Sequence, residues 1–142
     1  HEKESDNYLP IWIGPYEAEA ITIALQDVEV SRPLTHDLLK SVFLRLKGKL
    51  VRIDVAALKD DVFYAKIVVE YQDEIIEIDA RPSDAIAVAV RAHIPIFVDS
   101  EVMDKAGIHP ETELRDKEES APETSIPAEP GGEKRLSVFE DF

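Results

Sequence analysis

Two stretches of the chain place an arginine, a proline, a hydroxyl residue and an aspartate in the same order. The first runs over residues 32–37 (RPLTHD) and the second over residues 81–84 (RPSD). Hydroxyl and acidic residues are favoured at helix starts and proline is tolerated there, so helix entry explains most of both stretches. It does not explain Arg32 and Arg81. An arginine at such a place either pairs with a carboxylate or offers its planar fork to an anion such as phosphate.

Both stretches precede segments whose apolar residues recur at helical spacing. Helices are predicted at residues 17–28, 35–46, 83–92 and 101–106, with Thr35 as the N-cap of the second. Strands are predicted at residues 8–13, 51–58, 62–71, 75–80 and 94–98, because β-branched and aromatic residues dominate them. Polar turns at residues 59–61 and 72–73 join the middle three strands into an antiparallel meander. The sequence thus predicts an α+β fold, a compact mixed or antiparallel sheet packed with two to three helices.

The charge of the chain limits how it can bind nucleic acid. The formal net charge is -14; residues 1–110 carry 12 Lys and Arg against 20 Asp and Glu, and residues 111–142 carry 4 against 10. Clamping duplex DNA depends on Lys and Arg that displace counterions, so this composition disfavours a stable duplex-binding protein. The absence of cysteine excludes disulfides and thiolate metal sites. No signal peptide opens the chain and no apolar run approaches the roughly 20 residues of a membrane span, which predicts a cytoplasmic protein.

Composition divides the chain into three parts. Residues 1–110 have the apolar content of one globular domain. Residues 111–135 are mostly Glu, Ser, Pro, Ala, Lys and Gly, which predicts an acidic disordered linker. Apolar residues return at helix-like spacing in residues 136–142, which we expect to form a short amphipathic helix.

Five motifs in register resemble the bifunctional nuclease domain family. They are LPIWIG with YEA (residues 9–18), RPLTHDLL (32–39), FYA (63–65), DARPSDAIAVAVR (79–91) and PIFV (95–98), and the final LSVFEDF resembles the family's C-terminal helix. The resemblance implies a compact, often oligomeric α+β domain that degrades both DNA and RNA. The chain departs from the family pattern because the strand or hairpin that normally precedes LPIWIG is truncated or absent.

The acidic residues inside these motifs supply candidate catalytic groups. Asp37, Asp79, Asp84 and Glu17 are candidate ligands of Mg²⁺ or Mn²⁺, because carboxylates that hold such a cation can neutralise a phosphate and activate water. Asp37 and Asp84 are also candidate catalytic residues, together with His36, whose ordinary pKa suits a general base. The alternative for each aspartate is a cap or an ion pair, and for His36 a hydrogen-bonded histidine at a helix start.

The arginines and aromatic residues allow a similar choice. Arg32 and Arg81 are candidate phosphate-binding residues, or members of a buried network that holds the two helix starts together. Trp12 and Tyr8 could stack on a base, although their position in a predicted strand favours the core or an interface.

Two functions from different classes follow from these residues. The first is a nuclease-like hydrolase of low sequence specificity, dependent on a divalent cation, with DNA and RNA as substrates. The second is a non-catalytic oligomeric scaffold or regulatory module. Convergence of the two arginine-bearing helix starts in an exposed site would favour the enzyme, and mutual pairing in the core would favour the scaffold. A homo-oligomer is expected in either case.

Overall fold

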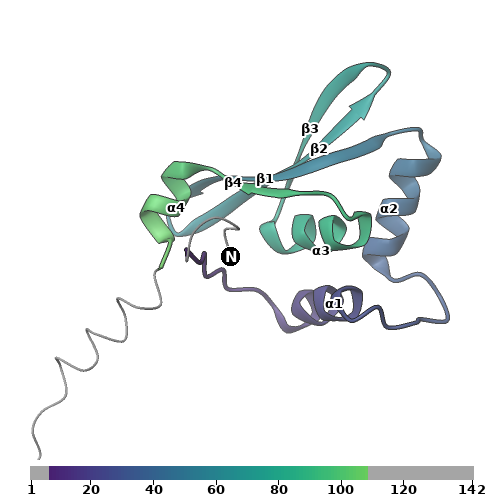
Figure 1. The fold of residues 1–142 in the computed structure, drawn as a ribbon, viewed down its shortest axis with the longest axis horizontal. Coiled ribbons are helices and arrows are strands. Elements are labelled where there is room, and N and C mark those ends of the chain that lie inside the picture. The colour runs from purple at the N-terminus through teal and green to yellow at the C-terminus, as the bar shows by residue number, and fades with distance from the viewer. Residues whose placement is uncertain (1–6, 109–142) are drawn as a thin grey trace, which may run out of the picture. The chain divides into compact units, whose positions relative to one another are not determined.

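The computed structural model describes residues 7–108, and this part of the chain is an α+β domain (Figure 1). Its helices and strands follow in the order α1 Pro15–Leu25, α2 Thr35–Arg45, β1 Lys49–Lys59, β2 Val62–Tyr71, β3 Glu74–Ala80, α3 Pro82–Ala92, β4 Ile96–Val98 and α4 Ser100–Ala106. The α+β prediction is therefore confirmed. Within residues 7–108, no helix is long and apolar enough to cross a membrane.

The sheet is mixed, with the strand order β3-β2-β1-β4. β1, β2 and β3 form the predicted antiparallel meander, and β4 returns through α3 to pair with β1 in parallel. Both hairpin turns use residues with positive φ, Asp60 and Asp61 in the first and Gln72 and Asp73 in the second. Such turns match the right-handed twist of the strands that they connect.

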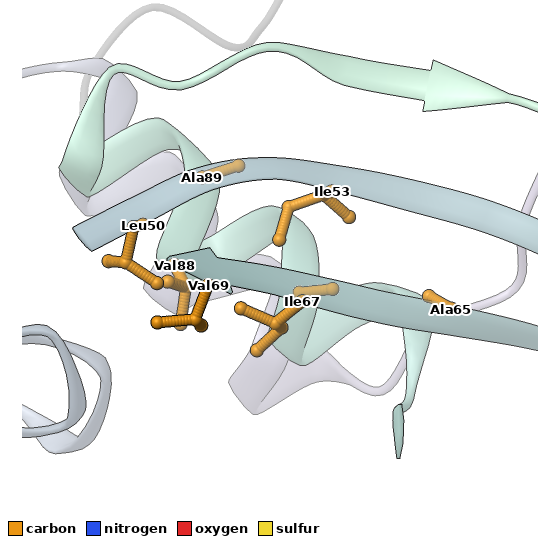
Figure 2. Packing of buried hydrophobic residues seen from close by; sticks show 8 residues of the cluster. Leu50, Ile53, Ala65, Ile67, Val69, Val88 and Ala89 are labelled. Atoms are coloured by element: carbon orange, nitrogen blue, oxygen red, sulfur yellow. The ribbon is translucent and has the colours of Figure 1, made fainter. Parts of the chain in front are cut away.

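α3 covers one face of this sheet and forms the centre of the fold (Figure 2). Apolar side chains from β1, β2 and α3 make the buried cluster, which consists of Leu50, Ile53, Ala65, Ile67, Val69, Ala85, Val88 and Ala89. α1 and α2 both pack against α3, and Figure 1 shows α1 on the side of α3 that faces away from the sheet. The start of α3 therefore lies close to elements that precede it by more than forty residues.

The predicted strand at residues 8–13 does not form. Only Tyr8 pairs, in an isolated bridge to Ile108 with N···O distances of 3.0 and 2.8 Å. Pro10 has no N–H to donate to a strand ladder, and residues 9–14 run as an extended segment into α1. Trp12 does not lie in the core of this domain, because it is 100% exposed, and its alternative place in an interface stays a prediction.

Two expectations about the helices are corrected as well. Leu34 rather than Thr35 is the N-cap of α2, and the carboxylate of Asp37 accepts the backbone N–H of Leu34 at 2.9 Å. Helical spacing in residues 83–92 predicts a face of α3 with Ile86, Ala89 and Val90 on one side, but the face that enters the core carries Ala85, Val88 and Ala89. The predicted linker at residues 111–135 and the predicted helix at residues 136–142 lie outside the described residues.

Candidate functional site

Arg81 stands at the junction between β3 and α3, where it is the N-cap residue of α3. Its Nε donates to Asp84 Oδ2 at 2.7 Å, and its Nη2 donates to Asp84 Oδ1 at 3.2 Å. The same Nη2 also donates to Glu17 Oε1 at 3.0 Å. Arg81 therefore makes a bidentate ion pair with Asp84 and connects the first turn of α3 to the first turn of α1.

His36 joins this network from the first turn of α2. Its Nε2 lies 3.1 Å from Asp84 Oδ1, and only a tenth of its side chain is exposed. We call Glu17, His36, Arg81 and Asp84 the Arg81 site. Three helix starts that are distant in sequence meet there because α1 and α2 both pack on α3.

The electrostatics of the Arg81 site keep Asp84 ionised. The hydrogen bonds from Arg81 lower the pKa of Asp84, partial burial opposes them, and His36 lowers the pKa further. Because an ionised carboxylate can only accept, the proton of neutral His36 lies on Nε2 and Nδ1 is left as the basic nitrogen. A carboxylate that fixes an imidazole in this way is the arrangement used to orient a general base.

Asp37 belongs to a different cluster. Its Oδ1 accepts from Nε of Arg91 at 2.7 Å, while Nη1 and Nη2 of Arg91 donate to the carbonyls of Ala87 and Ala20, each at 2.9 Å. Lys40 Nζ donates to the carbonyl of Arg91 at 2.6 Å. These groups, which we call the Arg91 junction, connect α1, α2 and α3 through a side chain that is only 5% exposed.

Opposing effects set the pKa of Asp37. Burial raises it, but the hydrogen bonds from Leu34 and Arg91 and the positive charge of Arg91 together hold it below its ordinary value. Beside the Arg91 junction lies a cavity of about 250 Å³. Its lining includes Asp37, Lys40 and Arg91, together with apolar residues of α1. Nε, Nη1 and Nη2 of Arg91 each donate a hydrogen bond within the protein, so this guanidinium group stabilises the contacts between the helices.

The structure thus brings together some of the predicted residues and separates others. His36, Arg81, Asp84 and Glu17 converge, and they do so at a partly exposed position, with the side chain of Arg81 66% exposed. Arg32 is exposed and makes no ion pair within residues 7–108. Arg32 makes no hydrogen bond or ion pair with the residues of the Arg81 site, so the expected convergence of the two arginines is not observed.

Asp79 also lies apart. It is an exposed residue of β3 that pairs in register with Lys66 of β2. Lys66 alternates with the core residues Ala65 and Ile67, so this part of the sheet presents Asp79 on the face away from α3. Across residues 7–108, no group of three or more acidic or histidine residues could hold a metal ion. The predicted carboxylates Asp37, Asp79, Asp84 and Glu17 hence do not form one ligand set.

The sequence interpretation did not identify Arg91 and Lys40. Arg91 follows Ala87 and Val88 at helical spacing and lies on the same buried face of α3. A cation at the end of an otherwise small and apolar stripe is a detectable signal, since buried arginine is rare without a carboxylate partner. Its partner Asp37 is 54 residues earlier in the chain, and local spacing alone does not reveal the pair.

Comparisons with known proteins define the class of this domain. Residues 1–111 match the sequence model of the bifunctional nuclease domain, so the chain belongs to the bifunctional nuclease domain family. It is 42% identical over 107 residues to the "Uncharacterized protein Rv1829" of Mycobacterium tuberculosis, a match that covers 75% of this chain and 63% of the relative. The chain therefore spans less than two thirds of the length of that curated relative.

More distant relatives come from plants. The chain is 32% identical over 102 residues to "Bifunctional nuclease 2" of Oryza sativa subsp. japonica, covering 68% of this chain and 31% of the relative. It is 28% identical over 93 residues to "Bifunctional nuclease 1" of Arabidopsis thaliana, covering 63% of this chain and 29% of the relative.

Proposed function

We propose that this domain is a nuclease-like hydrolase of low sequence specificity that acts on DNA and RNA. The observation that carries the proposal is the chain of contacts from His36 through Asp84 to Arg81 in a domain of the bifunctional nuclease family. The names of the plant relatives agree with this activity. The acidic surface favours nucleic acid as a transient substrate over a stable duplex partner.

Each residue of the Arg81 site has a role in this proposal. His36, held by the ionised Asp84, accepts a proton from the attacking water through Nδ1. Arg81 has Nη1 without a partner within residues 7–108, and this N–H group is directed to a phosphate oxygen of the substrate. Glu17 and Asp84 position the guanidinium. Arg32, exposed beside the start of α2, is a second phosphate contact in the proposal.

Dependence on Mg²⁺ or Mn²⁺ is a separate part of the proposal. The four predicted carboxylates do not fit a resident metal ion, because Asp37 pairs with Arg91 and Asp79 lies on the far face of the sheet. Glu17 and Asp84 remain as two carboxylates in one place, and Mg²⁺ is often bound by one or two carboxylates plus substrate phosphates. Such a cation would supply charge neutralisation at the phosphate.

A cleavage assay on the purified chain tests the proposal. Short fluorescent single strands of DNA and of RNA are incubated with Mg²⁺, with Mn²⁺ and with a chelator, using the parent chain, Asp84→Asn and His36→Gln. We expect cleavage of both strands and a loss of about 10²- to 10⁴-fold in either variant. Asp104→Asn, an exposed aspartate of α4, is the matched control and should retain full activity.

Two results would remove parts of the proposal separately. Cleavage that survives Asp84→Asn and His36→Gln would show that the Arg81 site does not carry the activity. Cleavage that is insensitive to the chelator would refute the dependence on a divalent cation and leave the proposed roles of His36 and Arg81 in place. A preparation with no cleavage under any condition would refute the proposed hydrolase activity as a whole.

The alternative function, an oligomeric scaffold, has an observation of its own. Leu38 and Val42 of α2 are 60% and 42% exposed, and Ile75 of the edge strand β3 is 60% exposed. Apolar residues one helical turn apart favour contact with a second copy of the chain, which either function permits. Light scattering of the parent chain and of Leu38→Glu tests this. A monomer at every concentration would exclude the scaffold.

A further inference from the structure

Two exposed aromatic residues belong to the segment that leads into Glu17 of the Arg81 site. Trp12 is 100% exposed and Tyr16 is 81% exposed. Tryptophan and tyrosine are largely buried in most folded domains, because each carries a large apolar ring. A single exposed ring needs no explanation, but two within five residues, beside a cluster of charged groups, call for one.

The chain geometry keeps the backbone of both residues near this site. Tyr16 immediately precedes Glu17, whose Oε1 lies 3.0 Å from Arg81 Nη2. A Cβ atom added to Gly14 would clash with Glu17 Oε2, so the backbone of Gly14 lies against the same carboxylate. Trp12 is two residues from Gly14, and their Cα atoms are no more than about 7.6 Å apart. Residues 12–16 therefore border the Arg81 site.

We propose that Trp12 and Tyr16 form a stacking surface for the unpaired bases of a single-stranded nucleic acid whose backbone is bound at Arg81. This inference rests on the proposed nuclease function and names the form of substrate that the site selects. Every base has a flat π face, so stacking on aromatic rings binds single strands with little regard to sequence. In a duplex the base faces are covered by neighbouring bases, and the surface has nothing to contact.

The surroundings of the two rings favour a nucleic acid strand over a second copy of the chain. Glu17 follows Tyr16 directly in the chain and pairs with Arg81, which also pairs with Asp84. The dry centre of a protein interface is depleted of charge, and removing such groups from water is costly. A stacked base covers the rings and leaves the carboxylates and the guanidinium in water.

The acidic domain also requires a contribution to affinity that is not electrostatic. In the proposed complex the cations that contact phosphate are Arg81 and Arg32, in a chain whose net charge is -14, so counterion release contributes little. Stacking supplies binding without positive charge. We therefore expect the logarithm of the association constant to fall with the logarithm of salt concentration with a slope no steeper than about -1.4, the value for two phosphate contacts on a single strand.

The chain contains one tryptophan, so its intrinsic fluorescence reports Trp12 alone. The full chain, with chelator present, is titrated with a 12-nucleotide oligo(dT), with an abasic 12-nucleotide strand and with a 12-base-pair duplex. We expect quenching by oligo(dT) and none by the abasic strand or the duplex. Binding of a labelled oligo(dT) should weaken about 5- to 150-fold in Trp12→Ala and by less in Trp12→Phe, which keeps a stacking ring.

Tyr71→Ala, a change of an exposed aromatic residue at the end of β2, is the matched control and should bind as the parent chain does. Equal quenching by the abasic strand would overturn the proposal, as would a Trp12 emission that shifts with protein concentration alone as a dimer forms. Cleavage with no change in Trp12 fluorescence would refute the stacking surface and spare the nuclease. Quenching by oligo(dT) without cleavage in the parent chain would refute the nuclease and leave a binding surface.

Discussion

The domain contains two arginine–aspartate clusters that differ in almost every physical respect. At the Arg91 junction the arginine is 5% exposed, and Nε, Nη1 and Nη2 all donate within the protein. At the Arg81 site the arginine is 66% exposed and its Nη1 has no partner in the described part of the chain. The comparison separates an arginine that fixes the packing of helices from one that remains available to a ligand.

The two aspartates differ in the same sense. Asp37 accepts the backbone N–H of Leu34 at the start of its own helix and pairs with Arg91. Both of its oxygens therefore make contacts that stabilise the fold. Asp84 lies between Arg81 and His36, and its pairing orients a histidine that could move a proton. A common pattern of residues at two helix starts has thus produced one structural site and one candidate functional site. The predictions below test that division.

The largest expected effect is a loss of stability in Arg91→Leu. Removing this guanidinium leaves Asp37 as a partly buried, unpaired carboxylate, and the carbonyls of Ala20 and Ala87 lose their donor. We expect the free energy of unfolding to fall by about 3–5 kcal/mol, measured by urea denaturation followed by circular dichroism. Lys105→Leu, at an exposed pair with Glu101, is the control and should change stability by less than about 1 kcal/mol.

If Arg91→Leu does not fold, Arg91→Lys provides the same comparison. Lysine keeps a cation near Asp37 but lacks the planar guanidinium group that donates to the carbonyls of Ala20 and Ala87. A variant as stable as the parent chain would show that the Arg91 junction does not hold the three helices together.

The next largest effect is a loss of activity in Arg81→Ala with little loss of stability. The pairs of Arg81 are solvent-exposed, and such pairs contribute about 1 kcal/mol or less to folding. Removal of a positive hydrogen-bond donor at the reacting phosphate is expected to lower kcat/KM about 100-fold. Urea denaturation and a fluorescent cleavage assay on the same preparation measure both quantities. A loss of several kcal/mol of stability would place Arg81 among the structural residues and support the scaffold.

A smaller effect is expected on the acid side of the stability profile. The pKa values of Asp37 and Asp84 are lowered in the folded protein, so in acid the unfolded chain binds protons before the folded chain does. The stability contributed by these carboxylates is therefore complete above about pH 4 and is lost as the pH falls through their folded-state pKa values. Urea midpoints between pH 6 and pH 2.5 should decline less steeply in Asp37→Asn and Asp84→Asn than in the parent chain. Superimposable profiles would refute the two ion pairs.

The smallest effect is expected for Arg32→Ala. Arg32 is exposed and has no ion pair in residues 7–108, so stability should change by no more than about 0.5 kcal/mol. As a peripheral phosphate contact, its loss should raise KM at most about fivefold and leave kcat unchanged, since one exposed charge contributes about 1 kcal/mol or less. Initial rates over a range of oligonucleotide concentrations measure both constants. A fall in kcat as large as that of Arg81→Ala would show that Arg32 contributes to the reaction as much as Arg81 does.

The sequence by itself determined the meander, the three main helices and the residue types of the candidate site. The β-branched and aromatic residues of 62–71 and the helical spacing in residues 83–92 are local patterns, and local patterns follow from backbone geometry. The tertiary structure alone decided the partners. His36 and Asp84 are 48 residues apart, Asp37 and Arg91 are 54 apart, and Trp12 is exposed rather than buried. A side chain's chemistry states what it can bind, but the packing of α1 and α2 on α3 determines which group it reaches and which remains in water.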